Sequence, residues 1–249
     1  MASENLQQHY ASFYASGEDF EWRRLGAIDK ADNIVRAWRS LTGTRPRVVE
    51  IGCGDGAIAA RLAELDFFDS YLGFDISESG IGAAKARAIV RADFAVSGFP
   101  IPLKDDSADV VIMSHVIEHL EHPRQLIREA RRIAPLLIAE VPLELNRGLR
   151  IDYDWNPVGH INKYSGKAIR QLIQTCQFDV LAQFTTNPSR DVALFHTPGI
   201  RSSTKWVIKQ SALRVTPNIA RSMFTFHETL IAQRNERTHP SHGVGAKRI

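Results

Sequence analysis

The chain has 249 residues, of which 44% are hydrophobic and 24% charged, and it contains two cysteines. These values are typical of a folded globular protein and exclude a disordered chain, a collagen and a disulfide-stapled mini-protein. The net charge of +3 comes from the end of the chain, because 233–249 holds four of the 31 basic and one of the 28 acidic residues. The remaining 232 residues are balanced, which argues against a nucleic-acid partner.

The chain shows no targeting or membrane segment. Its first residues lack the apolar stretch of a signal peptide. The most apolar run, 133–143, is too short to cross a membrane and contains Glu140. We therefore expect a cytoplasmic protein with no membrane partner.

Predicted helices and strands alternate along the first two thirds of the chain. Apolar spacing indicates helices at 4–15, 28–40, 57–65, 77–88 and 122–132. Short apolar runs indicate strands at 47–52, 70–74, 89–94, 108–113 and 135–141. This alternation predicts an α/β fold, a doubly wound, mostly parallel sheet with helices on both faces.

The last third of the chain has a different character. A long loop at 142–164 has little apolar periodicity and is expected to form a cap over a substrate. Further elements are expected in this order: a helix at 165–176, a strand at 178–185, a helix at 200–218 and a strand at 221–232. The expected organisation is an N-terminal helical lid at 1–42, one domain at 43–235 and a disordered tail at 236–249.

The segment Glu50–Gly56 (EIGCGDG) is the strongest motif. It follows a predicted strand and opens a helix, so its glycines let the backbone approach a ligand at the helix N-terminus. The spacing also satisfies the dinucleotide pattern GxGxxG/A, so a nicotinamide-dependent oxidoreductase is an alternative. Asp75 and Asp93 end the next two predicted strands, which places three acidic residues at the edge where ligands bind in open sheets.

These residues, together with SGFPIPLKDDSADVVIMSHVIEHLEHP, resemble class I S-adenosylmethionine-dependent methyltransferases of the type 11 and type 23 groups. The resemblance covers about residues 45–145 and extends weakly through 159–165. It implies a Rossmann-like sheet of seven strands with the last strand antiparallel. It also implies S-adenosylmethionine as methyl donor, S-adenosylhomocysteine as product and a small-molecule acceptor, most naturally methylated on oxygen.

The resemblance also assigns roles to individual residues. Gly52 and Gly54, with Glu50 and Cys53 in the same motif, would border the methionine moiety and ribose. The carboxylate of Asp75 would bind the ribose hydroxyls. The other cofactor-binding residues implied are Ile76, Asp93 and Phe94 around adenine, and Ser114 and His115 beside the transferred methyl group.

Histidines are the candidate catalytic bases, because imidazole titrates near neutral pH. The candidates are His160, His115 and His119. Small-RNA 2′-O-methyltransferases and ubiquinone-pathway O-methyltransferases use a similar ExxEH motif with a distant histidine to hold a divalent metal. Here His115 replaces the first glutamate, so we expect no metal, although a divalent ion and purely structural histidines both stay open.

Three alternatives to a small-molecule methyltransferase therefore stay open. They are the oxidoreductase, a metal-assisted RNA 2′-O-methyltransferase and a non-catalytic nucleoside-binding module. Mixed charges and aromatic residues in the long loop would suit a polar small molecule; they are Glu144, Asn146, Arg147, Arg150, Tyr153, Asp154 and Trp155. The sequence identifies neither the acceptor nor the oligomeric state, although a homodimer is possible.

Overall fold

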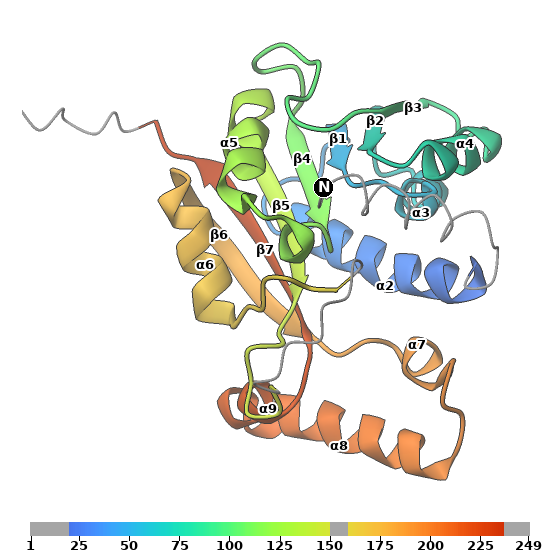
Figure 1. Cartoon of the computed structure of the whole chain (residues 1–249), viewed down its shortest axis with the longest axis vertical. Coiled ribbons are helices and arrows are strands. Elements are labelled where there is room, and N and C mark those ends of the chain that lie inside the picture. The colour runs from blue at the N-terminus through green and yellow to red at the C-terminus, as the bar shows by residue number, and fades with distance from the viewer. Residues whose placement is uncertain (1–19, 150–158, 237–249) are drawn as a thin grey trace, which may run out of the picture.

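A computed structural model describes residues 20–149 and 159–236. In these ranges seven strands form one sheet (Figure 1). They are β1 (Arg47–Ile51), β2 (Ser70–Asp75), β3 (Ala92–Val96), β4 (Val110–Ser114), β5 (Leu136–Pro142), β6 (Phe178–Thr186) and β7 (His227–Arg234). Their order is β3-β2-β1-β4-β5-β7-β6, and only β7 runs antiparallel to its neighbours β5 and β6. The predicted α/β fold with an antiparallel last strand is confirmed.

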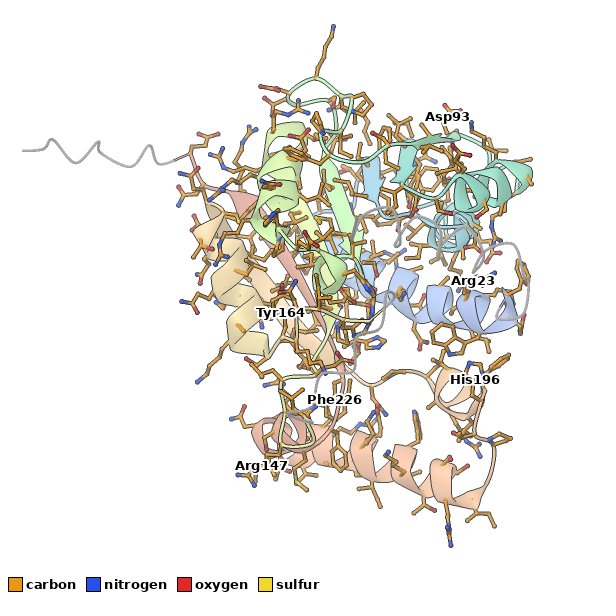
Figure 2. All side chains as sticks on the ribbon, in the orientation of Figure 1. Arg23, Asp93, Arg147, Tyr164, His196 and Phe226 are labelled. Atoms are coloured by element: carbon orange, nitrogen blue, oxygen red, sulfur yellow. The ribbon has the colours of Figure 1, made fainter. Side chains whose placement is uncertain are left out.

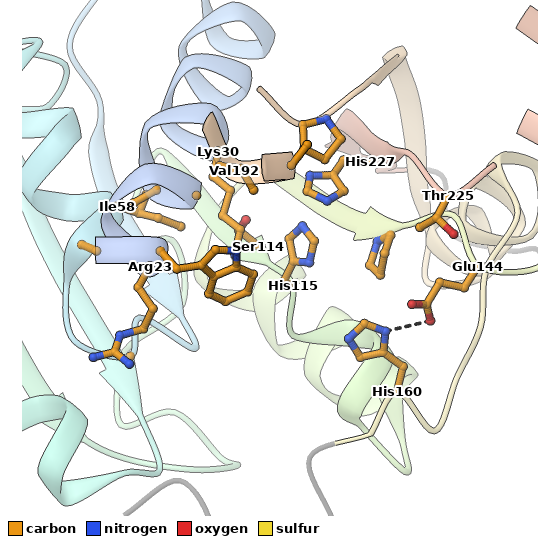
Figure 3. Close-up of a pocket in the computed structure, with 18 of the residues that line it drawn as sticks. Arg23, Lys30, Ile58, Ser114, His115, Glu144, His160, Val192, Thr225 and His227 are labelled. Atoms are coloured by element: carbon orange, nitrogen blue, oxygen red, sulfur yellow. Dashed lines mark hydrogen bonds and ion pairs between the residues drawn. The ribbon is translucent and has the colours of Figure 1, made fainter. Parts of the chain in front are cut away.

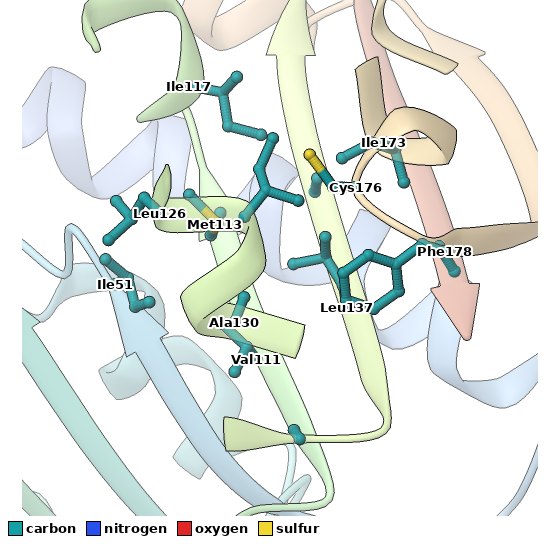
Figure 4. Close-up of a cluster of buried hydrophobic side chains, with 14 of the residues drawn as sticks. Ile51, Val111, Met113, Ile117, Leu126, Ala130, Leu137, Ile173, Cys176 and Phe178 are labelled. Atoms are coloured by element: carbon teal, nitrogen blue, oxygen red, sulfur yellow. The ribbon is translucent and has the colours of Figure 1, made fainter. Parts of the chain in front are cut away.

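Helices cover both faces of the sheet. One face packs against α2 (Phe20–Arg39), α3 (Ala57–Glu64) and α4 (Glu78–Ala86). The other packs against α5 (Pro123–Ile133) and α6 (Gly166–Thr175), where Ala130 and Ile173 are fully buried (Figure 4). Central strands therefore bury both faces, which explains why their sequences are apolar throughout.

Three further helices lie beyond the end of β5, away from the sheet (Figure 1). They are α7 (Arg190–Leu194), α8 (Ile200–Val215) and α9 (Pro217–Met223). A small separate cluster of Leu143, Ala220 and Phe226 packs there. The sequence predicted one helix at 200–218, but the chain breaks at Thr216 and Pro217 begins a new helix, as proline favours the first helical turn.

Several predicted boundaries were wrong. The final strand begins at His227 rather than at residue 221, because α9 occupies the preceding segment. The third strand is Ala92–Val96 rather than 89–94, because Ala88 and Arg91 have positive φ angles and form a turn there. The short α7 was not predicted. The helix expected at 4–15 and the tail expected at 236–249 lie outside the described residues, the tail apart from its first residue.

The helix α2 both packs against the sheet and lines a cavity. Its C-terminal half is buried against the sheet through Ala31, Ile34 and Trp38, while its N-terminal half borders the cavity described below. It is longer than the predicted 28–40. No helix in the described ranges is long and apolar enough to cross a membrane.

Candidate active site

A cavity of about 800 Å³ opens at the carboxyl ends of β1 and β4. Its walls come from α2, the turn after β1, the loop after β4, and α7 and α8. Arg23 and Lys30 lie on one side, Glu144 and His160 lie on the other, and His115 lies between them (Figure 3). The cavity is therefore assembled from segments spread over most of the chain.

The glycine turn forms one border of this cavity. Gly52 has a φ of +82°, and a Cβ atom there would lie 2.2 Å from Cγ2 of Val116. The Gly52 amide donates to the carbonyl of Phe74 at 2.7 Å, which holds the turn against β2. Only glycine fits this position. Gly52, Cys53 and Gly54 all line the cavity, and the two glycines leave the backbone of the turn open to it.

Asp75 lies at the end of β2, as predicted, and its side chain is hydrogen-bonded to the glycine turn. Its carboxylate accepts from the Gly54 amide at 2.8 Å and from the Ser77 amide at 2.9 Å. Burial raises the pKa of Asp75, and the backbone amides oppose that rise. Each carboxylate oxygen has a second lone pair, so the group can also accept from a ligand hydroxyl.

The other residues predicted around the cofactor divide into two sets. Cys53 and Ser114 line the cavity beside the turn. Glu50 is fully buried in β1, where it accepts from the Tyr71 hydroxyl and where burial raises its pKa to about 8. The carboxyl of Glu50 is therefore bonded to β2 inside the sheet and does not line the cavity.

The prediction that Asp93 ends its strand was wrong. Asp93 is the second residue of β3 and is exposed (Figure 2). It pairs in register with Leu72, whereas Asp75 pairs with Val96. Phe94 is buried, and its ring contacts Tyr71. Ile76 lies close to Gly98, in the loop that follows β3. That loop, rather than Asp93, lies next to Asp75 at the carboxyl edge.

His115 follows β4 and is held between two buried carboxylates. Its φ of 55° is rare for any residue with a side chain. Its Nδ1 lies 3.2 Å from Glu118 Oε1 and its Nε2 lies 3.3 Å from Glu140 Oε1. Burial and Lys30 lower the pKa of His115, but the two carboxylates outweigh them and raise it. The two carboxylates therefore favour the imidazolium form of His115.

Glu140 is the centre of this cluster. It is 1% exposed, and its Oε2 accepts from Asn33 Nδ2 at 2.8 Å and from Thr229 Oγ1 at 2.7 Å. Burial favours the protonated form, but His115 and His227 hold the pKa of Glu140 at about 2. For His227, burial and the nearby charge on His115 lower the pKa to about 3, so this second imidazole is neutral.

A second group of side chains lies beside the first. His160 Nδ1 lies 2.7 Å from Glu144 Oε2, and the rings of His160 and His119 meet edge to face with centroids 4.8 Å apart. Burial lowers the pKa of His119. His115, Glu118 and His119 do not lie on an α-helix, because a 3₁₀ turn, Ile117–His119, follows β4.

Among residues 20–149 and 159–236, two sets of three side chains have ligand atoms within 4.8 Å of one another and could hold a metal ion. They are His115, Glu140 and His227, and Glu118, His119 and His160. A metal-assisted RNA 2′-O-methyltransferase would use His115, Glu118, His119 and His160, and these residues are divided between the two sets.

Several residues of the site were not predicted from the sequence. Glu140 had a visible signal, a charged residue inside an otherwise apolar strand, which requires buried partners. His227 and the lysines of α8, which also line the cavity, had no local signal because they come from the end of the chain.

Comparisons with known proteins agree with this geometry. Residues 21–183 match the family model of a methyltransferase domain. A curated protein of Mycolicibacterium smegmatis, named a probable S-adenosylmethionine-dependent methyltransferase, is 29% identical over 137 residues, which cover 53% of this chain and 52% of that protein. The chain thus matches about half the length of this relative. The family match favours the methyltransferase interpretation of the glycine turn over the oxidoreductase.

Solved structures share the fold at low identity. Magnesium protoporphyrin IX methyltransferase from Synechocystis, with bound S-adenosylhomocysteine, has a TM-score of 0.57 at 18% identity and covers 90% of this chain and 98% of its own. The [4+2]-cyclase SpnF has a TM-score of 0.61 at 19% identity and covers 84% and 81%. Because one neighbour is named a cyclase, the fold alone does not define the reaction.

Proposed function

The chain belongs to the family of methyltransferase domains, and on that premise we propose that it transfers the methyl group of S-adenosylmethionine to an oxygen atom of a small molecule. The observation that carries the proposal is the pair formed by His160 and Glu144, which faces the same cavity as the glycine turn. A base and a cofactor turn on one cavity are what in-line methyl transfer to a hydroxyl group requires.

The residues at the glycine turn fit the cofactor. Asp75, which is bonded to the Gly54 amide of the turn, would accept from the ribose hydroxyls. The open backbone of Gly52 and Gly54, which lines the cavity, would lie along the methionine part. Ser114 Oγ is buried without a hydrogen-bond partner among the described residues, so a polar group of the cofactor would satisfy it. Lys30, which lines the cavity, would offset the negative charge of the carboxylate on the methionine part of the cofactor. When bound, S-adenosylmethionine supplies an activated methyl group on its sulfonium.

His160 is the base in this proposal. Glu144 accepts from Nδ1–H of His160, which fixes the tautomer and leaves Nε2 as the acceptor for the proton of a substrate hydroxyl. His115 is unsuited to this role, because both of its nitrogens face carboxylates, which favour its doubly protonated form. The ring of His119 packs edge to face against that of His160, with centroids 4.8 Å apart.

The first test is titration of the purified chain with S-adenosylhomocysteine, with NAD as the control ligand. We expect micromolar binding of S-adenosylhomocysteine and none of NAD. Binding of NAD alone would contradict the assignment of the turn, and tight binding without turnover on any acceptor would favour the nucleoside-binding module.

The second test is turnover by variants of the pair, followed as formation of S-adenosylhomocysteine with a panel of hydroxylated acceptors. Removing a general base typically costs about 10²- to 10⁴-fold in kcat, so we expect His160→Gln to lose roughly that much. Glu144→Gln should lose less, because it removes only the orienting contact. Unchanged turnover in both variants would contradict O-methylation assisted by this pair.

A further inference from the structure

The helix α8 presents a polar face to the cavity. Ser202, Lys205, Trp206 and Lys209 line it, and their spacing of three, four and seven residues places them on one stripe. The aliphatic residues Val207 and Val215 of the same helix do not line the cavity and are 54% and 78% exposed. A helix that packed for stability alone would bury the apolar stripe instead.

The stripe is held in place by contacts at its centre and end. The indole Nε1 of Trp206 donates to the carbonyl of Pro188 at 2.8 Å, which fixes α8 relative to the segment before α7. Lys209 Nζ lies 5.1 Å from the centre of the Phe226 ring, within the range of a cation–π contact. Burial lowers the pKa of Lys209 to about 8. This ammonium is thus kept in a partly desolvated place where it would gain from an anion.

The carboxylates of the cavity are already engaged. Asp55 lies 3.3 Å from Arg23 and 3.1 Å from Arg87, and Glu144 is paired with His160. Within residues 20–149 and 159–236, no carboxylate forms an ion pair with Lys205 or Lys209. Two lysines one helical turn apart therefore leave an excess of positive charge on one wall of an otherwise balanced cavity.

We infer that Lys205 and Lys209 form a subsite for an anionic group, a carboxylate or a phosphate, on the molecule that receives the methyl group. Lysine binds such groups as a point charge, and two of them on one helix face suit a group with several oxygens. Trp22 and Trp206 line the same cavity and offer flat apolar surface for the body of the molecule. This inference rests on the proposed function and adds the class of acceptor: a hydroxylated aromatic acid or phosphate ester.

The test compares two probes of nearly identical shape on the full chain saturated with S-adenosylhomocysteine. 4-Hydroxybenzoate carries a carboxylate, and 4-hydroxybenzamide is its neutral counterpart. By calorimetry we expect the benzoate to bind at least tenfold more tightly, and the double variant Lys205→Gln/Lys209→Gln to lose that preference. Phenyl phosphate, titrated alongside, tells whether the subsite prefers phosphate or carboxylate.

Matched variants separate this charge effect from a loss of structure. Lys205→Arg/Lys209→Arg keeps the charge and should keep the preference. Lys104→Gln/Lys167→Gln removes two exposed lysines that do not line the cavity and should also keep it. Equal binding of both probes, binding of neither at millimolar concentration, or a preference that survives the double glutamine variant overturns the subsite. Failure of the wild-type chain to bind S-adenosylhomocysteine contradicts the proposed function instead.

Discussion

The two halves of the cavity are held together by different forces. The half that borders β1 and β2 is shaped by backbone, with amides of Gly52 and Gly54 bonded to neighbouring groups of β2. The half beyond β4 and β5 is shaped by buried charged side chains around Glu140 and by a helix that buries no residue. A site that binds one cofactor benefits from a rigid backbone frame, whereas side chains on separate segments can change with the acceptor.

The largest effect on stability is expected from a substitution among the buried charged side chains around Glu140. Glu140→Gln leaves the His115 imidazolium with one carboxylate instead of two, and loss of one partner from a buried ion pair costs about 3–5 kcal/mol. We expect the free energy of unfolding in urea to fall by roughly that amount. Glu64→Gln, which removes an exposed partner of Arg61, is the control and should have little effect. A small change in the Glu140 variant would mean that the cluster adds little stability.

A substitution in the half that borders β1 and β2 should change the affinity for S-adenosylhomocysteine. Asp75→Ala loses the predicted charge-assisted contacts to ribose, worth roughly 1.5–3 kcal/mol or about 10- to 150-fold in affinity for S-adenosylhomocysteine. The control is Asp69→Ala, which removes an exposed carboxylate paired with Arg45 just before the other end of β2. Unchanged affinity in the Asp75 variant would overturn the cofactor assignment.

The charged half of the cavity also determines how stability depends on pH. Because His227 has a pKa of about 3 in the folded chain and about 6.5 when unfolded, unfolding takes up a proton below pH 6.5. The His227 contribution therefore makes the unfolding free energy fall by up to about 1.4 kcal/mol per pH unit from pH 6.5 toward 3. We expect His227→Asn to flatten the profile in that window and to leave it unchanged above pH 7.5. Parallel profiles would show that the pKa of His227 is the same in the folded and unfolded chain.

The smallest expected effect is that of metal removal. His115 and Glu140 already neutralise each other, and Glu144 engages His160, so we expect turnover to be the same with and without EDTA. Inactivation by EDTA that a divalent ion reverses would indicate that one of the two sets of three side chains holds a metal. The variants His119→Ala and His227→Ala would then identify which.

The same contrast explains what the sequence could predict. The glycine turn and Asp75 lie within 26 residues of each other in a fixed strand–turn–helix pattern, so their meeting follows from local rules. The pairing of His160 with Glu144 does not, although both residues were singled out, because a loop conformation decides it. Asp93 was misplaced because Ile89 and Val90 look like the start of a strand but lie in a turn, where Val90 is 77% exposed.

The partners of Glu140 illustrate the other limit. Asn33 and Thr229 come from α2 and β7, and β7 reaches β5 only because it inserts between β5 and β6. No periodicity in the sequence predicts that three such distant segments share one carboxylate. A buried charge in an apolar strand predicts that partners exist, but only the topology identifies them.

The small cluster that anchors α8 and α9 has a consequence for local opening. Leu143, Ala220 and Phe226 are its buried members, and it is separate from the clusters on either face of the sheet. A unit with so little buried apolar surface opens at a lower free energy than the sheet, so its amides should exchange with solvent first. The wall that carries Lys205 and Lys209 can therefore open while the glycine turn stays folded, which would let an acceptor enter and its methylated product leave without release of the cofactor.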